Sequence, residues 1–494
     1  MGDRVTSLAA LGLTAQGGRE AQITGLSVDS RSVRDGHLFA ALPGSRIHGG
    51  EFIQYALRMG AGAILTDRQG AEIARRELDA TGVPLVLAED PRQALAFSAA
   101  LWFGIQPETV VAVTGTNGKT SVATFTRQIW TALGLKSVNL GTTGVEGAYQ
   151  APLAHTTPEP ITLHRLLAEV AEAGIGHVAM EASSHGLAQR RLDGVRLTAA
   201  AFTNFTQDHL DYHASFEEYF AAKSALFTRV LPDDGAAVIN LDDPRGPEIA
   251  DMVLDRGQDL LTIGRSADAN LRVRAQRYDA TGQDLRFDWN GQPRQVRLDL
   301  IGGFQAENVL SAAGLVIASG CDPTRVFDVL PELTGVRGRM QLAATRDTGA
   351  AVFVDYAHTP DALKTALKAL RPHVLGRLVV VFGAGGDRDT TKRPLMGAAA
   401  ETYADVVFVT DDNPRSEIPS DIRADILAGC PDATEVGDRA EAILRGVDAL
   451  QPGDALLIAG KGHETGQTVG DDVFPFDDVE QASVAVAALD GHVV

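Results

Sequence analysis

Short apolar runs alternate with helix-compatible stretches along most of the chain, and this alternation predicts an α/β fold with three successive domains. The first domain, expected over residues 1–89, is small and contains a helix near Phe52–Met59. Val28 and Ser30 are expected at a strand end or turn, where surface turn chemistry explains them as well as ligand binding does. The expected strands of this domain are Leu38–Leu42, Ala63–Leu65 and Leu85–Leu87.

The second domain, expected over residues 90–333, is the largest and begins with a helix at Arg92–Phe103. Its expected strands are His177–Met180, Ala199–Thr203, Ala236–Asn240 and Leu260–Ile263. Because helical or loop stretches separate these strands, we expect a mostly parallel sheet with helices on its faces. Residues 271–300 instead alternate polar and apolar side chains, and this pattern predicts a small antiparallel insertion.

The apolar pattern restarts after Pro331 and predicts a third α/β domain over residues 334–494. Its expected strands are Val352–Asp355, Leu378–Phe382, Val406–Thr410 and Leu456–Ala459. Its expected helices are Asp361–Leu370, Pro419–Ala428 and Ala440–Leu450. The sequence contains no internal repeat and no low-complexity tract that would interrupt this organisation.

Length and composition agree with a globular protein of several domains. The chain has 494 residues, well beyond the roughly 250–300 at which a single core stops growing. Its formal net charge of -20 argues against a general affinity for nucleic acid or anionic membranes. The only cysteines, Cys321 and Cys430, fit neither a disulfide framework nor a zinc site, and no apolar run approaches the length of a membrane span. These features predict a cytoplasmic protein without membrane insertion. The expected oligomeric state, which these features do not determine, is a monomer.

A glycine-containing loop in the second domain carries the clearest chemistry. It follows the apolar run Val110–Val113 and has the sequence Gly115-Thr116-Asn117-Gly118-Lys119-Thr120-Ser121. In such a strand–loop–helix arrangement backbone N–H groups surround a phosphate, Lys119 reaches the β- and γ-phosphates, and the Thr120 hydroxyl holds Mg²⁺. Val113 stands where the strict pattern has its first glycine, so an ordinary glycine-rich turn is the alternative. The apolar strand directly before the loop favours nucleotide binding.

Polar residues follow two other expected strands of this domain, at the edge where open α/β sheets bind ligands. Glu181 comes directly after one strand, where it suits either a nucleotide-bound Mg²⁺ or the capping of a helix. Residues 203–213 follow the next strand and include two histidines and two aspartates. A zinc site is the alternative there, although no cysteine or helical histidine pair supports it. Lys223 lies on an expected helix, Phe216–Phe227, and its ammonium is expected to reach solvent.

Charged residues also gather after the strands of the third domain. Residues 383–389 begin like a dinucleotide fingerprint, but Arg388 occupies the third glycine position, so a nicotinamide site is poorly supported. Arg388 and Arg415 can each bind a carboxylate through two hydrogen bonds, and Glu464 can bind an ammonium. Opposite charges at strand ends indicate a zwitterionic ligand such as an amino acid, and surface ion pairs are the alternative.

These motifs, in this order from about residue 23 to residue 480, resemble those of the Mur ligases of bacterial cell-wall synthesis. The resemblance implies a first domain for the UDP end of the substrate, a central P-loop ATPase, and a Rossmann-like C-terminal domain that closes over the site. It implies an ATP-dependent ligase that forms an acyl phosphate. The expected substrates are UDP-N-acetylmuramoyl-L-alanyl-D-glutamate, ATP and meso-diaminopimelate.

On this resemblance, the UDP-linked substrate contacts residues of two domains. Those of the first domain are Val28, Ser30, Ser45, Arg46 and Ile47. Those of the second domain are His155, Thr156, Thr157, Ser183, Gln189 and Arg191. His155 stands where relatives often have asparagine, so this position departs from the family pattern.

The resemblance also implies the residues around ATP and its metal ions. ATP is expected at Gly115–Ser121, with further contacts from Asn308, Arg337 and Asp355. Two Mg²⁺ ions are expected, with Thr120 and Glu181 as ligands of the first and His209 of the second. Lys223 matches the carbamylated lysine of the family, and CO₂ addition turns an ammonium that would repel Mg²⁺ into an anion that can bind it. The expected catalytic residues are Lys119, His209, Lys223 and His358.

The third domain is expected to select the amino acid. Asp412-Asn413-Pro414-Arg415 is similar to the tetrapeptide that family members use for meso-diaminopimelate, in which the arginine binds the distal carboxylate. The other matching contacts are Arg388, Gly460 and Glu464. Lysine-adding relatives lack this arginine, which would stay unpaired beside a lysine substrate. Three alternatives stay open: another diamino acid such as L-lysine, a folylpolyglutamate synthetase-like ligase, and a nucleotide-binding switch or scaffold without ligation.

Overall fold

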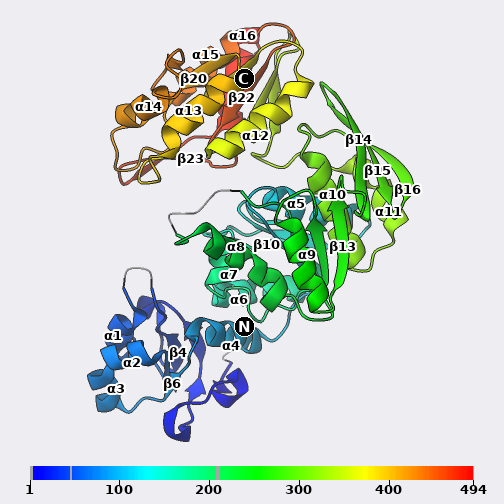
Figure 1. Ribbon diagram of the computed structural model, residues 1–494. Coiled ribbons are helices and arrows are strands. Elements are labelled where there is room, and N and C mark those ends of the chain that lie inside the picture. The colour runs from blue at the N-terminus through cyan, green and yellow to red at the C-terminus, as the bar shows by residue number, and fades with distance from the viewer. Residues whose placement is uncertain (1–3, 45–46, 207–211, 493–494) are drawn as a thin grey trace.

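The computed structural model describes residues 4–44, 47–206 and 212–492 and contains a separate main β-sheet in each of three regions (Figure 1). The N-terminal region, drawn in blue, lies at one end of the molecule, and the C-terminal region, drawn in yellow to red, lies at the other. The predicted α/β fold with three domains is confirmed. The expected site residues Ser45, Arg46 and His209 fall outside the described ranges.

The N-terminal domain is built on a small parallel sheet. The strands lie in the order β3 (Gly25–Ser27), β4 (His37–Ala40), β5 (Ala63–Thr66) and β6 (Leu85–Leu87). Two short strands, β1 (Thr6–Ser7) and β2 (Gln22–Ile23), pair separately and antiparallel. The α-helices are α1 (Ile53–Arg58), α2 (Arg68–Ile73) and α3 (Arg75–Thr81), with 3₁₀ turns at Ala9–Leu11, Gln16–Gly18, Ser30–Ser32 and Gly49–Phe52. The three strands predicted here are confirmed.

The central domain contains a ten-stranded sheet with a parallel middle. Its parallel strands are β8 (Ser137–Gly141), β10 (His177–Glu181), β7 (Thr109–Thr114), β11 (Ala199–Phe202), β12 (Ala236–Asn240) and β13 (Asp259–Gly264). At one edge β9 (Gly144–Gly147) pairs antiparallel with β8. At the other edge β14 (Leu271–Asp279), β15 (Gly282–Trp289) and β16 (Gln292–Leu298) are antiparallel to one another. The mostly parallel sheet was predicted correctly.

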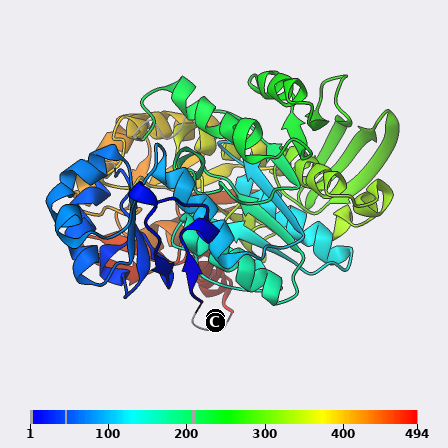
Figure 2. The same cartoon turned by 90° about the horizontal axis from the view of Figure 1, so that it is seen from below.

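The antiparallel strands β14–β16 extend the central sheet and do not form a separate inserted unit. Ile263 pairs with Leu271 in parallel, which joins β13 to β14 directly. These strands project from the side of the central domain that faces away from the N-terminal domain (Figures 1 and 2). The predicted antiparallel pattern is therefore confirmed, and its placement as an insertion is corrected.

Burial on both faces explains why the central strands could be recognised in the sequence. Along β7, Val111 and Val113 pack into one hydrophobic cluster, whereas Val110 and Ala112 pack into another on the opposite face. A strand covered by helices on both sides needs apolar residues at every position. The helices of this domain are α4 (Pro91–Phe103), α5 (Lys119–Ala132), α6 (Pro160–Glu172), α7 (Ser184–Ala188), α8 (Phe216–Ala225) with a π-helical turn at Leu226–Val230, α9 (Gly246–Asp255), α10 (Gln305–Ala318) and α11 (Pro323–Asp328), followed by a 3₁₀ turn at Leu330–Glu332.

The C-terminal domain contains a six-stranded sheet with helices on both faces, as a Rossmann-like fold requires. The strands lie in the order β17 (Gln341–Thr345), β18 (Ala351–Asp355), β22 (Ala455–Ala459), β19 (Leu378–Phe382), β20 (Val406–Val409) and β21 (Thr434–Glu435), and only β17 is antiparallel to its neighbour. A hairpin of β23 (Gly466–Val469) and β24 (Asp472–Pro475) follows. The helices are α12 (Pro360–Leu370), α13 (Lys392–Tyr403), α14 (Pro419–Leu427), α15 (Arg439–Asp448) and α16 (Asp478–Asp490), with a 3₁₀ turn at Arg371–His373.

A short segment of the central domain packs against the C-terminal domain. Ile301 belongs to the hydrophobic cluster of α12, α13 and their sheet. The buried His373 ring accepts a hydrogen bond from the Gly302 N–H at 3.1 Å, and its Nδ1 lies 2.7 Å from the Asp279 carbonyl oxygen. A carbonyl oxygen only accepts, so Nδ1 carries the proton and the ring is neutral in this contact. We call residues 301–304 together with His373 the docking segment.

The predicted domain boundaries at residues 89/90 and 333/334 stay a prediction. Helix α4, just after the first boundary, buries Leu95 and Trp102 in the core of the N-terminal domain, and the helix also contacts α6. Arg190 of the central domain forms an ion pair with Asp90 at 2.8 Å. Among the described helices, none has both the length and the apolar character that crossing a bilayer requires.

Candidate active site

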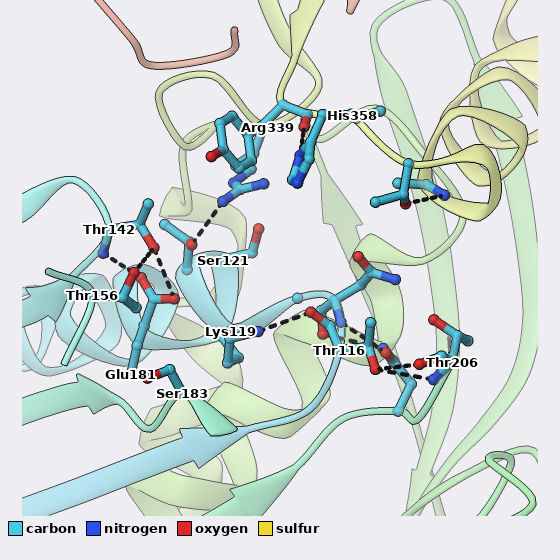
Figure 3. A pocket seen from close by; sticks show the side chains of 18 of the residues that line it. Thr116, Lys119, Ser121, Thr142, Thr156, Glu181, Ser183, Thr206, Arg339 and His358 are labelled. Atoms are coloured by element: carbon cyan, nitrogen blue, oxygen red, sulfur yellow. Dashed lines mark hydrogen bonds between the residues drawn. The ribbon is translucent and has the colours of Figure 1, made fainter. Parts of the chain in front are cut away.

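A cavity of about 660 Å³ lies where the carboxyl ends of β7 and β10 approach the C-terminal domain (Figure 3). The phosphate loop forms one wall, residues 155–157 and 181–185 form another, and residues 355–359 of the C-terminal domain close a third side. The strand ends of an α/β sheet are the usual place for a ligand. The cavity therefore brings together residues that the sequence analysis assigned to separate motifs.

The phosphate loop has a backbone that only glycine tolerates at two positions. Gly115 has φ +146°, and a Cβ there would collide with the Thr203 hydroxyl. Gly118 has φ +88°, and a Cβ there would lie 2.6 Å from Asn308 Oδ1. Helix α5 begins at Lys119, so its N-terminal N–H groups face the loop and favour an anion. The loop thus has the form of a phosphate cradle and not of an ordinary turn.

The Lys119 ammonium already lies within this cradle. Its Nζ donates hydrogen bonds to the carbonyl oxygens of Gly115 and Thr116, both at 2.8 Å. Carbonyl groups hold the side chain over the loop without neutralising its charge. An anionic ligand is therefore met by a positioned cation and by the N-terminus of a helix.

Glu181 is suited to a metal ion and does not cap a helix. It is the last residue of β10 and is almost fully buried, and its carboxylate accepts hydrogen bonds from the Thr142 N–H at 2.8 Å and from the Thr142 hydroxyl at 3.2 Å. The following helix α7 is capped by Ser183, which accepts from the Gly186 N–H. Thr120 lines the same cavity. Carboxylate and hydroxyl oxygens fit a hard ion such as Mg²⁺, and the capping alternative is excluded.

Lys223 is buried, and the expectation that its ammonium reaches solvent was wrong. Only 1% of this residue is exposed, and its Nζ donates to the Gly115 carbonyl oxygen at 2.7 Å. The same nitrogen lies 4.5 Å from the centre of the Tyr219 ring, and the side chain lines the cavity. The packing of α8 against neighbouring elements determined this placement, and neighbours along the chain do not reveal it.

The residues expected to hold the UDP-linked substrate form a hydrogen-bonded group at one end of the cavity. The Thr157 hydroxyl donates to the Glu181 carbonyl oxygen at 2.8 Å and accepts from the Ser183 N–H at 3.0 Å. Arg191 donates to the Thr157 carbonyl oxygen at 2.6 Å. His155 and Thr156 also line this cavity.

A second, smaller cavity of about 80 Å³ continues toward the N-terminal domain. Arg191 lines both cavities, and Gln189 and Val28 line the smaller one. Val28 comes from the N-terminal domain, so the expected contacts of both domains meet there. Ser30 and Ile47 line neither of these two cavities in the part of the chain that the structure describes.

On the C-terminal side of the cavity the structure corrects the expectation that Arg337 contacts ATP. Arg337 does not line the large cavity and instead forms an ion pair with Asp477 at 2.9 Å, whereas Arg339 does line it. Arg339 donates to the Thr120 hydroxyl at 3.2 Å and lies 4.6 Å from the centre of the Tyr356 ring. The two arginines are two residues apart in an irregular segment, where no periodicity tells which one turns inward.

Three other residues expected near ATP do line the cavity: Asn308, Asp355 and His358. The Asp355 carboxylate accepts from the N–H groups of Met340 at 2.6 Å and Ala357 at 2.9 Å. Burial raises the pKa of Asp355, and the nearby Arg339 opposes this effect. Asp355 therefore fixes the segment that carries Arg339.

The residues expected to hold the amino acid form a separate group after β20 and β22. Asn413 donates to Glu464 at 2.9 Å, and Arg415 donates to the Gly386 carbonyl oxygen at 2.7 Å. Asp412 and Pro414 are buried beside them, and a Cβ on Gly460 would collide with Asp412. Arg388 is exposed. Except for Arg388, these residues are at least half-buried, which argues against ordinary surface ion pairs.

Each of the three domains matches a known protein family. The Mur ligase family catalytic domain matches residues 22–102, the Mur ligase middle domain matches 113–316, and the Mur ligase glutamate ligase domain matches 338–462. A curated UDP-N-acetylmuramoyl-L-alanyl-D-glutamate–2,6-diaminopimelate ligase from Bradyrhizobium diazoefficiens is 49% identical over 471 residues, which cover 94% of this chain and 95% of that protein. The chain belongs to the Mur ligase family.

Further relatives of this Mur ligase agree in sequence and in fold. The ligase of the same name from Caulobacter vibrioides is 48% identical over 475 residues, covering 95% of this chain and 96% of that protein. A solved UDP-N-acetylmuramoyl-L-alanyl-D-glutamate–2,6-diaminopimelate ligase has 33% identity and a TM-score of 0.71, covering 99% of this chain and 100% of the other. A folylpolyglutamate synthase of Mycobacterium tuberculosis shares the fold, with 19% identity and a TM-score of 0.62. The match covers 81% of this chain and 94% of the other.

These findings confirm the predicted family and the predicted class of enzyme. This Mur ligase is an ATP-dependent, amide-bond-forming enzyme of peptidoglycan synthesis, and such ligases use ATP, Mg²⁺ and UDP-linked muramoyl peptides. The scaffold alternative without ligation is thereby set aside. The folylpolyglutamate synthetase-like alternative rests on a shared fold alone.

Proposed function

We propose that this Mur ligase adds meso-diaminopimelate to UDP-N-acetylmuramoyl-L-alanyl-D-glutamate. The observation that carries the proposal is that one large cavity is lined both by the phosphate loop and Glu181 and by Thr156 and Arg191, which are expected to hold the muramoyl peptide. The names of the relatives, which are close to half identical over nearly the full chain, support the choice of substrates. Since ATP and UDP-linked precursors are cytoplasmic metabolites, we place the reaction there, and we propose that the enzyme acts as a monomer.

In the first step a carboxylate oxygen of the terminal D-glutamate attacks the γ-phosphorus of ATP. The bond from this phosphorus to the bridging oxygen of ADP breaks, and an acyl phosphate forms. Lys119 and the loop N–H groups stabilise the charge on the transferring group. Bound Mg²⁺ supplies further neutralisation of the phosphates. Thr120 and Glu181 are the proposed protein ligands of one ion, and His209 of a second.

In the second step the free amine of diaminopimelate attacks the acyl carbon, the carbon–oxygen bond breaks, and phosphate leaves. The nitrogen must also lose a proton. His358 is the proposed acceptor because its Nδ1 lies 2.8 Å from the Tyr356 carbonyl oxygen. Nδ1 therefore carries the proton, and in the neutral ring Nε2 is the basic nitrogen.

The acyl phosphate must be protected from water between the two steps. The Arg339 guanidinium comes from the C-terminal domain and bonds to Thr120 on the phosphate loop, so it links the two sides of the cavity. Closure of the C-terminal domain onto the central domain is the proposed means of excluding water.

Lys223 is proposed to act as a carbamate. CO₂ adds to its amine with loss of a proton, and the product is an anion with two oxygen atoms. The buried Nζ lies beside the phosphate loop, close enough to bond to Gly115, so a carbamate there would face the phosphate and metal region.

The amino acid is proposed to bind through charges at its distal end. Arg415 takes the distal carboxylate, Glu464 takes the ammonium, and Arg388, Gly460 and the loop Asp412–Pro414 complete the contacts. L-lysine has no distal carboxylate, so it leaves Arg415 unpaired and is rejected.

The test measures phosphate release with the UDP-muramoyl-dipeptide, ATP and Mg²⁺, adding meso-diaminopimelate or L-lysine in parallel reactions. We expect strong stimulation by meso-diaminopimelate alone, with a tripeptide product detected by mass. Stimulation by L-lysine would keep the ligase activity and discard the role of Arg415. Stimulation by neither would overturn the proposed acceptor.

A further inference from the structure

Lys461 is a fully buried lysine between the two loops that are proposed to hold the amino acid. It lies two residues after the end of β22 and has a relative exposure of 0%. A lysine is almost never buried completely unless its ammonium is paired. The groups that contact the Lys461 ammonium therefore indicate its role.

The Lys461 ammonium joins the two loops by direct contacts. Its Nζ donates to Asn413 Oδ1 and to the Gly466 carbonyl oxygen, both at 2.9 Å. The same nitrogen lies 4.0 Å from Asp412 Oδ1 and 3.8 Å from Glu464 Oε2. One side chain thus contacts the loop after β20, which contains Asp412 and Asn413, the loop after β22, which contains Glu464, and Gly466 at the start of β23.

Asn413 extends this connection to the hairpin β23–β24. Its Oδ1 also accepts from the Thr468 N–H at 2.9 Å, and its Nδ2 donates to Glu464 at 2.9 Å. The Arg415 N–H donates to the Thr468 carbonyl oxygen at 3.1 Å, and the Arg415 carbonyl oxygen accepts from the Gly470 N–H at 2.7 Å. Arg415 has φ +50°, which is uncommon for a residue other than glycine. The hairpin is therefore held by Asn413 and Arg415, which belong to a loop that Lys461 contacts.

The charges of this cluster do not cancel. Arg439 and Asp478 form a fully buried pair at 2.7 Å, whereas Lys461 lies 4.0 Å from Asp412 and 3.8 Å from Glu464. Arg439 also attracts both of these carboxylates, but its own charge is matched by Asp478. Burial lowers the pKa of Lys461 and raises that of Glu464, and the neighbouring opposite charges counteract both effects. One negative charge in excess beside Arg415 suits a ligand end that carries an ammonium and a carboxylate.

We propose that Lys461 is a positioning residue for amino-acid selection: it holds Asp412, Glu464 and the Arg415 loop in the arrangement that recognises the zwitterionic end of the substrate. This inference rests on the proposed function. Lys461 itself does not contact the substrate. Its removal therefore changes the binding of the amino acid and the choice between amino acids. The contacts of the Lys461 ammonium are to Asn413, Gly466, Asp412 and Glu464 and not to the phosphate loop, so we expect ATP binding to change much less.

The experiment compares the Lys461→Met variant, which keeps the length of the side chain without its charge, with wild-type enzyme. We expect KM for meso-diaminopimelate to rise by about 10- to 100-fold, the effect of losing a hydrogen bond to a charged group. KM for ATP and for the UDP-linked substrate should stay within about twofold, and the preference for meso-diaminopimelate over L-lysine should fall about tenfold by the same argument. Lys136→Met, at an exposed position of the central domain, is the matched control.

Lys461→Gln separates the two contributions of the side chain, because a glutamine retains a donor but has no charge. The Asn413→Ala variant completes a double-mutant cycle, and the combined cost of Lys461→Met and Asn413→Ala should fall well short of their sum because both break one connection. Additive effects would overturn the proposal, as would an unchanged KM for meso-diaminopimelate or equal rises in all three KM values. Failure of both Lys461 variants to fold would show a purely structural role and overturn it too. A wild-type enzyme that ignores meso-diaminopimelate would instead refute the proposed function.

Discussion

The phosphate loop and the loops proposed to hold the amino acid (residues 412–415 and 460–464, called here the amino-acid loops) belong to one enzyme but are built in opposite ways. The phosphate loop is a single stretch, Gly115–Ser121, whose chemistry comes mainly from backbone N–H groups, a helix N-terminus and one lysine held by carbonyl oxygens. The amino-acid loops draw on separated segments, and their charged side chains hold one another through Lys461 and Asn413.

This difference determines how each region responds to substitution. A backbone site tolerates changes of side chain except at the few positions that set its conformation or its charge. A site made of buried, mutually paired charges is destabilised when any member is removed, because the remaining charge stays buried without an opposite charge beside it. We therefore expect sharp, localised effects at the phosphate side and shared effects at the amino-acid side.

The largest effect is expected at Lys223. The Lys223→Ala variant should lose ligation by about 10²- to 10³-fold or more, as expected when a group that stabilises transition-state charge is removed. Binding of the UDP-linked substrate, measured by calorimetry, should stay close to wild type. Acetate should restore part of the activity if the missing group is a carbamate. Restoration by methylammonium, or lost binding with retained turnover, would contradict the carbamate role.

Arg339 should matter much more than Arg337, although the two are neighbours in sequence. Arg339→Ala should lower kcat/KM for ATP by about 10- to 100-fold, because it removes a cation from the cavity and a hydrogen bond to Thr120. Arg337→Ala should change it by less than about twofold, since a surface ion pair contributes little. Steady-state kinetics on both variants measure this contrast, and equal effects would mean that the arginines exchange places in the working enzyme.

Arg415 should affect selection more than catalysis. Arg415→Leu should raise KM for meso-diaminopimelate by about 10- to 30-fold and leave KM for ATP unchanged, because only the distal carboxylate loses its partner. KM for L-lysine should change little or fall. A matched loss with both amino acids would show that Arg415 supports the loop and does not read the carboxylate.

The smallest effect concerns pH and the docking segment. Burial lowers the pKa of His373, and the Asp279 backbone oxygen, Asp279 itself and Arg297 modify this shift. The neutral ring therefore stabilises the folded protein fully above the unfolded pKa of about 6.5, and this contribution is lost as pH falls from there toward the lower folded pKa. Thermal unfolding between pH 7.5 and 5.5 should show a steeper loss for wild type than for His373→Gln, by about 1 kcal/mol at most. Identical slopes would remove His373 from the pH dependence.

The sequence reveals the fold because the decisive signals are local. The strand β7 is apolar at consecutive positions since both of its faces are buried, and its end is marked by two glycines and a lysine. The sites made by tertiary packing are different. In the sequence Lys223 resembles a surface lysine, and only the packing of α8 beside the phosphate loop reveals its contact with Gly115. The contact of Lys461 with Asn413 likewise exists only because two loops far apart in the sequence meet.

Resemblance to a family supplied what local patterns could not, and it also introduced one error. It moved Lys223 into the site, in agreement with its burial, but it selected Arg337, whereas the neighbouring Arg339 lines the cavity. A motif match assigns residues reliably where regular elements flank the motif, as β7 and α5 flank the phosphate loop. Arg337 and Arg339 lie in an irregular segment, where the match can be displaced by two residues.

The docking segment anchors the C-terminal domain to the central domain, so it would be the pivot of the proposed domain closure. A rigid body that turns about an anchored point moves least near that point. Phe304 belongs to the docking segment, Glu307 and Asn308 follow it closely in sequence, and all three line the large cavity. The loops after β20 and β22 lead to α14 and β23, which lie on the side of the C-terminal domain away from β14 in Figure 1. If the C-terminal domain closes as proposed, these loops would move through a longer arc than the cavity wall near Asn308. The space beside the phosphate loop would then keep its shape while the loops approach it.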